Sequence, residues 1–167
     1  MLPTEANKED KVAFREKILT AQERMMGLIA DGHAQDALPE CKLTHTFTPL
    51  QEEFGCCTYA RQMFIPKGTL IIGKIHRHAH LNFIMQGRVK VSTEFGQKEL
   101  VAPCSFVSEV GLKRAVLAEE DTIWVTVHLT KFTSEQDLDK MEDEIIAPNY
   151  EEMGLISSVT DLRRLTA

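Results

Sequence analysis

Residues 73 to 82 read Gly73-Lys74-Ile75-His76-Arg77-His78-Ala79-His80-Leu81-Asn82, which places three of the chain's six histidines at alternate positions. In a β-strand, alternate side chains leave the backbone on the same face, so a strand here gathers three imidazoles on one small surface. Imidazole is the commonest protein ligand for transition metals. The pattern therefore predicts a metal site, with a solvated or hydrogen-bonded row of histidines as the alternative.

The residues around this stretch favour a strand over a helix. Residues 69–75 are rich in β-branched side chains, and they are preceded by the turn sequence Pro66-Lys67-Gly68 and followed by a second one, Gln86-Gly87-Arg88. On a helix, His76 and His80 would still share a face while His78 would point away. We expect the histidines in the middle of a β-hairpin.

Length and composition are typical of a single globular domain with a real core, because the 167 residues are 43% hydrophobic and 26% charged. The formal charge of −6 argues against a nucleic-acid partner, since phosphate binding needs clustered Lys and Arg. No apolar run could span a membrane and no secretory signal is visible. We expect a cytoplasmic protein with no membrane partner.

An amphipathic helix is predicted from about Lys8 to Asp31, with Gly32 as its C-cap. Its apolar face consists of Phe14, Ile18, Ala21, Met25 and Leu28, with Ile29 beside them. This face must pack either on the β domain or on a second subunit, and both stay open. Residues 1–42 are taken as this helix and a linker.

Residues 43–130 are predicted to form a double-sheet β-barrel, because many short β-rich runs are separated by turn signals. The predicted strands are Thr44–Thr48, Cys57–Ile65, Thr69–His80, Leu81–Met85, Val89–Thr93, Glu99–Val101, Ser105–Val107, Arg114–Leu117 and Thr122–Leu129.

Residues 131–167 are predicted to be a C-terminal helix and tail. The helix begins after Ser134, where Asp137 completes a near capping box, and it is stopped by Pro148. The tail, Asn149–Ala167, is either a docking arm for a partner or a segment that packs on its own domain, and Thr160-Asp161 could cap a last short helix.

Within Tyr59–Leu129, the order of strands, glycines and histidines resembles the cupin superfamily, whose members are small double-sheet barrels (jelly rolls). The family's first motif is Gly, five residues, His-x-His, three or four residues, Glu, six residues, Gly. Counting back from Gly87 puts His80 at the glutamate and His76 at the second histidine, which leaves Lys74 at the first. Counting from His76-x-His78 instead puts Asn82 at the glutamate position.

The second cupin motif is matched less well, because Arg114 stands where the family has a metal-binding histidine. A protonated guanidinium cannot bind a metal but can bind an anion. An alternative donor is His128, in the last predicted strand, which in a closed barrel can lie beside the first-motif strand. The resemblance thus implies a divalent metal, Zn, Fe, Mn or Ni, at His76, His80 and His128, with His78 as a substitute ligand and a small anionic molecule at Arg114.

A wider pattern is similar to small uncharacterised cupin-like proteins of tailed bacteriophages. It includes Tyr59-Ala60-Arg61, Ile65-Pro66-Lys67-Gly68-Thr69, Ala102-Pro103, and Asp121-Thr122-Ile123-Trp124 leading to His128. Two functions follow as hypotheses. The first is a metal-binding cupin with unknown chemistry, and the second is a non-catalytic barrel that serves a phage, in the host cytoplasm or the virion, through its terminal segments. A homo-oligomer is expected in either case.

Other polar or reactive side chains receive structural interpretations. Glu94 is expected to be solvated at a hairpin tip, and Trp124 is expected in the core, with ligand stacking as the alternative. His33 and His45 are assigned no function. The four cysteines are expected to be reduced thiols, because the adjacent pair makes a poor disulfide: Cys41, Cys56, Cys57 and Cys104.

Overall fold

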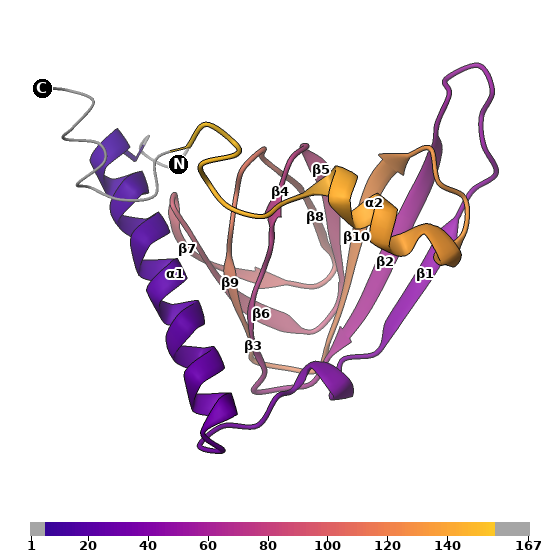
Figure 1. Cartoon of the computed structure of the whole chain (residues 1–167). Coiled ribbons are helices and arrows are strands. Elements are labelled where there is room, and N and C mark those ends of the chain that lie inside the picture. The colour runs from indigo at the N-terminus through magenta and orange to yellow at the C-terminus, as the bar shows by residue number, and fades with distance from the viewer. Residues whose placement is uncertain (1–5, 156–167) are drawn as a thin grey trace, which may run out of the picture.

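The computed structural model describes residues 6–155 and shows two facing β-sheets with a long helix beside them (Figure 1). The predicted fold class, mainly β with antiparallel sheets and two α-helices, is confirmed. Neither α-helix in the described part is long and apolar enough to cross a membrane.

One sheet has five strands in the order β1-β2-β10-β5-β8, and all its neighbours are antiparallel. Its strands are β1 (Leu43–Phe47), β2 (Cys57–Ile65), β5 (His80–Gln86), β8 (Cys104–Ser108) and β10 (Thr122–Thr130). Side chains alternate between its two faces. Along β10 the inward residues Thr122, Trp124, His128 and Thr130 are buried, whereas Leu129 on the outward face is 71% exposed.

The other sheet has four strands in the order β3-β9-β6-β7. Its strands are β3 (Leu70–Ile72), β6 (Arg88–Thr93), β7 (Gly96–Val101) and β9 (Ala115–Ala118). Inward side chains of both sheets form one core, in which Ile84 and Trp124 from the first sheet meet Val89 and Val116 from the second. The strand-rich sequence therefore closes into a sandwich with its apolar alternate positions inside.

The predicted strand Thr69–His80 is wrong. The chain forms β3, then a two-residue strand β4 (Ile75–His76), then a bend, and β5 begins only at His80. β4 leaves the four-stranded sheet and pairs instead with β11 (Ile146–Ala147). The backbone groups of Gly73 and His76 are bonded by residues of the loop before β9: the Gly73 N–H donates to Arg114 O at 2.8 Å, and the Gly111 N–H donates to His76 O at 2.9 Å.

The N-terminal helix is confirmed as α1 (Lys8–Ala30), and Gly32 lies just beyond it at φ +74°. Its buried face matches the predicted one only in part: Ile18 is buried as predicted, but Val12 and Arg15 are buried as well, while Ala21 and Leu28 are exposed. Arg15 is buried because both of its guanidinium donors reach the Glu94 carboxylate at 2.8 Å. The prediction that Glu94 is solvated is therefore wrong. Its side chain is only 8% exposed and forms a bidentate ion pair with Arg15.

The C-terminal helix begins with a 3₁₀ turn, Glu135–Asp137, and continues as α2 (Leu138–Ile145). The Ser134 hydroxyl caps it by accepting from the Gln136 N–H. The helix ends earlier than predicted, because Ile146 and Ala147 form β11 rather than another turn. Of the predicted tail, the part up to Leu155 packs on its own domain through Tyr150, which is 1% exposed against Ile75 and Ala147. The predicted cap at residues 160–161 lies outside the described residues.

Candidate metal centre

Three histidines from three strands meet at one end of the sandwich: His76 of β4, His80 of β5 and His128 of β10. One ring nitrogen of each lies within 4.8 Å of the others. The ring centroids are 4.2 Å apart for His76 and His80, 4.5 Å for His80 and His128, and 5.4 Å for His76 and His128. His80 and His128 are buried, and His76 is half-buried. This trio is the only group of its kind found in residues 6–155.

Strand register explains why these side chains converge. β5 and β10 are antiparallel neighbours in which Leu81 is opposite Val127, so His80 and His128 lie side by side on the inner face. His76 reaches the same point from β4, where its backbone is paired with Ile146 of β11. The trio therefore depends on contacts between segments that are far apart in the sequence.

A hydrogen bond fixes the tautomer of His80. The His80 Nδ1 lies 3.2 Å from the carbonyl oxygen of His78. A carbonyl only accepts, so Nδ1 carries the proton and Nε2 keeps its lone pair. Within residues 6–155, that Nε2 is buried without a hydrogen-bond partner, and so is the Nδ1 of His76. Buried nitrogens without partners are costly in a folded protein, and here two of them belong to rings of the same group.

The pKa values of all three rings are lowered, so the imidazoles are neutral at pH 7. Burial is the largest cause, followed by the neighbouring histidines, and it lowers the pKa of His76 to about 2 and that of His128 to about 4. Burial also lowers the pKa of His80. Neutral imidazole is the form that binds metals, so protons do not compete for these nitrogens at neutral pH.

His78 does not join the group. It lies in the bend before β5, and its side chain is exposed. The alternation of three histidines along one strand, which suggested the site, does not exist in the structure. His76 and His80 still meet because the bend returns the chain to the inner face.

Two arginines flank the trio, and neither forms an ion pair with a carboxylate in residues 6–155. The guanidinium of Arg114, which is 8% exposed, donates to the Ser108 hydroxyl and lies over the rings of Phe106 and Trp124 at 5.7 and 5.5 Å. Burial lowers the pKa of Arg114 to about 10, so it stays charged at neutral pH. Arg61 of β2 is close enough for its charge to lower the pKa of both His76 and His128.

The remaining positions of the first cupin motif are occupied by other contacts. Asn82 is fully buried and accepts from the indole N–H of Trp124 at 2.9 Å, which also confirms Trp124 as a core residue. Lys74 points to solvent and pairs with Glu142. Neither side chain belongs to the histidine group.

Sequence reasoning missed three residues around the trio: Arg61, Ser108 and Tyr59. Tyr59 is opposite His128 in the β2–β10 register, and its hydroxyl lies 2.8 Å from the Nδ1 of His45. Burial raises the pKa of Tyr59 to about 12, so the hydroxyl stays protonated at neutral pH and shares a hydrogen bond with the His45 ring. The available signal was that Tyr59 and Arg61 alternate on the inward side of β2, where a strand normally carries apolar residues.

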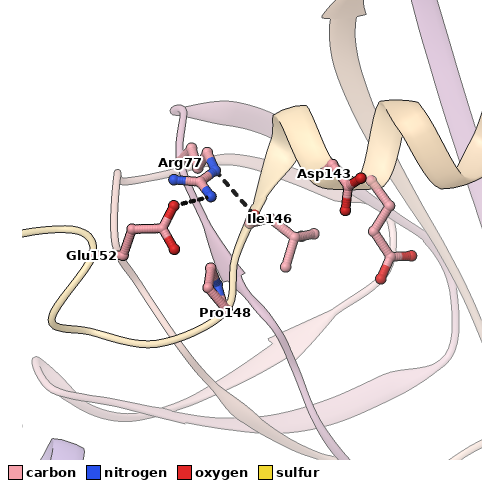
Figure 2. A pocket seen from close by; sticks show the side chains of 6 residues that line it. Arg77, Asp143, Ile146, Pro148 and Glu152 are labelled. Atoms are coloured by element: carbon pink, nitrogen blue, oxygen red, sulfur yellow. Dashed lines mark hydrogen bonds and ion pairs between the residues drawn. The ribbon is translucent and has the colours of Figure 1, made fainter.

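A surface pocket of about 390 Å³ lies nearby but does not contain the trio. It is lined by Arg77, Glu142, Asp143, Ile146, Pro148 and Glu152. Figure 2 shows Arg77 bridging two of its walls, through bonds to the Glu152 carboxylate and the Ile146 carbonyl. Of its acidic side chains, Glu152 pairs with Arg77 and Glu142 pairs with Lys74.

No family model matches the sequence, and no curated protein sequence matches it. Similar solved structures do exist. KdgF from Halomonas sp. has a TM-score of 0.46 and 18% identity, covering 61% of this chain and 88% of that one. Ectoine synthase from P. lautus has a TM-score of 0.44 and 12% identity, with 61% and 70% covered. A cupin superfamily protein from Desulfitobacterium hafniense DCB-2 has a TM-score of 0.42 and 10% identity, with 53% and 77% covered.

Proposed function

We propose that this protein binds one divalent transition metal, Zn, Fe, Mn or Ni, through His76, His80 and His128. The observation that carries the proposal is that two rings of this group, those of His76 and His80, each have a buried nitrogen with no hydrogen-bond partner in residues 6–155. A bound cation would supply both with a partner at once. His78 is retained only as a substitute ligand that would require the bend to rearrange.

The donor set fits such an ion. Nitrogen ligands about 2.1 Å from a tetrahedral metal lie about 3.4 Å apart, and the three nitrogens already lie within 4.8 Å of each other. Three protein ligands leave positions open for water or another molecule. A metal bound there would supply Lewis-acid chemistry, while the His78 carbonyl would hold the His80 ring in the tautomer that presents Nε2.

We further propose that the site holds a small anion bearing a carboxylate or phosphate group. Three neutral imidazoles, a divalent cation and two arginines without carboxylate partners add up to a large positive charge in a mostly buried place. Uncompensated buried charge is strongly unfavourable, so an anion would be bound tightly. Arg114 is the better-placed arginine, because Phe106, Trp124 and Ser108 hold its guanidinium in one position.

The metal proposal is tested by elemental analysis of untagged protein purified without chelator. We expect near-stoichiometric metal in the parent protein, and loss of it in His76→Ala and in His128→Ala. His78→Ala is the matched control, because this exposed histidine lies two residues from both His76 and His80; it should keep the metal. Absence of metal from the parent after loading with Zn²⁺, Fe²⁺, Mn²⁺ and Ni²⁺ would refute the proposal.

The anion proposal is tested on the metal-loaded protein by thermal unfolding with sodium acetate, sodium phosphate or sodium chloride at equal ionic strength. We expect acetate or phosphate to raise the melting temperature relative to chloride. Arg114→Gln should abolish that difference while retaining the metal. Equal melting temperatures in the three salts would count against the anion site and leave the metal site standing.

The rival proposal is a non-catalytic barrel that serves as a phage accessory or assembly protein. Its support is that Lys74 and Arg114 occupy positions where the first and second cupin motifs have histidines. Two results together would support this rival proposal: the parent protein binds no metal, and it forms a stable complex with a protein partner that requires the terminal segments.

A further inference from the structure

The outer face of the five-stranded sheet carries no charged side chain. Inward residues such as Tyr59, His80 and His128 define one face, and the residues between them point outward. The outward residues are Thr44 and Thr46 of β1, Thr58, Ala60, Gln62 and Phe64 of β2, Ile123, Val125, Val127 and Leu129 of β10, Leu81, Phe83 and Met85 of β5, and Ser105 and Val107 of β8. We call this surface the apolar face. It is unusual in a chain that is 26% charged.

The four-stranded sheet shows how the same protein solvates an outer face. There, Arg88 and Lys90 of β6 and Glu99 of β7 occupy outward positions. Lys90 pairs with Glu119 at 2.6 Å, and Arg88 reaches Glu119 and Glu120 at 3.5 and 3.3 Å. The outer face of the four-stranded sheet therefore combines ion-paired charges with exposed apolar residues such as Leu70, Val101 and Leu117, whereas the outer face of the five-stranded sheet carries no charge.

Neither helix covers the apolar face. α1 is anchored through Arg15 at the hairpin between β6 and β7, in the other sheet. α2 buries Met141 and Ile145 against Tyr59, which is an inward residue. Large side chains on the apolar face consequently meet solvent: Met85 is 60% exposed, Val107 61% and Leu129 71%. An uncharged surface with several exposed large apolar side chains is a candidate interaction site.

We propose that the occupant is a second copy of this chain, which packs apolar face to apolar face about a two-fold axis. Strands that average seven residues, at about 3.4 Å per residue and about 4.8 Å between strands, give a face of roughly 570 Å². Two such faces bury about 1,100 Å² in total, which exceeds the roughly 1,000 Å² expected of a specific interface.

Charge also favours a second copy. Each chain carries a net charge of −6, so two copies repel wherever their acidic surfaces approach. The apolar face brings no like charges opposite one another, and a symmetric pairing needs only one surface that is complementary to itself. The paired strands β5 and β10 are also those that carry His80 and His128 on their other side.

The test is the mass of the full-length protein by sedimentation velocity at micromolar concentration, with three variants. Leu81→Lys with Met85→Lys, and separately Val107→Lys, place charges on the apolar face. Leu70→Lys is the matched control on the other sheet, since Leu70 is 49% exposed and Leu81 46%. We expect the parent and the control at twice the chain mass of 18.9 kDa, and at least tenfold weaker association in both apolar-face variants.

Each contrary result overturns the proposal. A monomeric parent would mean that a lipid surface, another protein or residues 156–167 of the same chain occupy the face. A dimer unaffected by the apolar-face variants would place the interface elsewhere, and a control that dissociates equally would show that the effect is not specific to this face. Circular dichroism of each variant verifies that these exposed substitutions leave the fold intact.

Discussion

At the residue scale, the environment of a side chain decides what the same chemical group does. His76, His78 and His80 are alternate residues in one short stretch, yet only His76 and His80 are turned inward, where burial lowers their pKa values. Burial also makes a partner necessary for each polar atom. The two tyrosines of the chain show this contrast most simply, because the Tyr59 hydroxyl has a hydrogen-bond partner and the Tyr150 hydroxyl has none in the part of the chain that the structure describes.

Replacing each tyrosine by phenylalanine should shift stability in opposite directions. The Tyr150 hydroxyl is buried without a hydrogen-bond partner among the described residues, so Tyr150→Phe removes a desolvation cost and should raise the free energy of unfolding by up to about 1 kcal/mol. Tyr59→Phe loses the bond to His45 and should lower it by about 0.5–1.5 kcal/mol. Urea unfolding at pH 7 measures both. Equal losses in the two variants would show that the Tyr150 hydroxyl has a partner after all.

At the element scale, α1 is attached to the barrel by a buried charge pair rather than by an apolar stripe alone. Arg15 and Glu94 are 10% and 8% exposed, and the guanidinium also lies 5.5 Å from the Tyr150 ring centroid. Helix, hairpin and C-terminal segment therefore meet at one point. Breaking a buried pair leaves an uncompensated charge, which costs more than the pair itself contributes.

Glu94→Gln should therefore loosen α1. We expect the free energy of unfolding to fall by about 3–5 kcal/mol, or α1 to open locally, because Arg15 is left without its carboxylate. Hydrogen exchange of the α1 amides and urea unfolding report the two effects. The matched control is Glu142→Gln, whose ion pair with Lys74 is more than half exposed and should contribute within about 0.5 kcal/mol. Replacing both partners, as Arg15→Met with Glu94→Leu, should recover most of the loss.

At the scale of the whole molecule, the site and the stability of the fold are linked through protons and metal. The three rings are buried in their neutral forms, whereas in the unfolded chain they accept protons near pH 6.5. Folding therefore releases protons below that pH, and a bound metal would compete for the same nitrogens.

The metal-free protein should lose stability in mild acid. Because the pKa values of His76 and His128 are lowered to about 2 and about 4, their contribution is fully present above pH 6.5 and is lost as the pH falls toward those values. For each of these two rings, the free energy of unfolding should fall by about 1 kcal/mol between pH 7 and pH 5.5. Urea unfolding in the presence of chelator measures the loss, and His128→Gln should have a shallower pH dependence by about that amount. Identical slopes would show that His128 is not buried in its neutral form.

Metal should raise the stability of the whole fold. A ligand at about 100 times its Kd that binds only the folded state adds about 2.7 kcal/mol, which corresponds to roughly 5–10 °C for a chain of this size. We expect this shift with Zn²⁺ for the parent and for His78→Ala, measured by thermal unfolding, but not for His76→Ala. A shift of equal size in His76→Ala would indicate that zinc binds elsewhere.

Local patterns in the sequence were sufficient for much of the fold. The helical repeat and capping glycine located α1 (Lys8–Ala30), and β-branched runs located β2 at its observed bounds, Cys57–Ile65. These features are local, because helical and strand periodicity and turn propensity act over a few residues. The prediction that all four cysteines are free thiols rested on their spacing in the sequence, and the structure agrees with it.

The site and the surfaces depend on contacts that no local pattern encodes. The strand predicted through His76, His78 and His80 does not form, because β4 pairs with β11, a segment about seventy residues later. His128 lies beside His80 because of the β5–β10 register, and Glu94 is buried because α1 supplies Arg15. Burial, partner atoms and pKa values follow from which distant segments meet, and that is settled by the packing of the whole chain rather than by its neighbours in sequence.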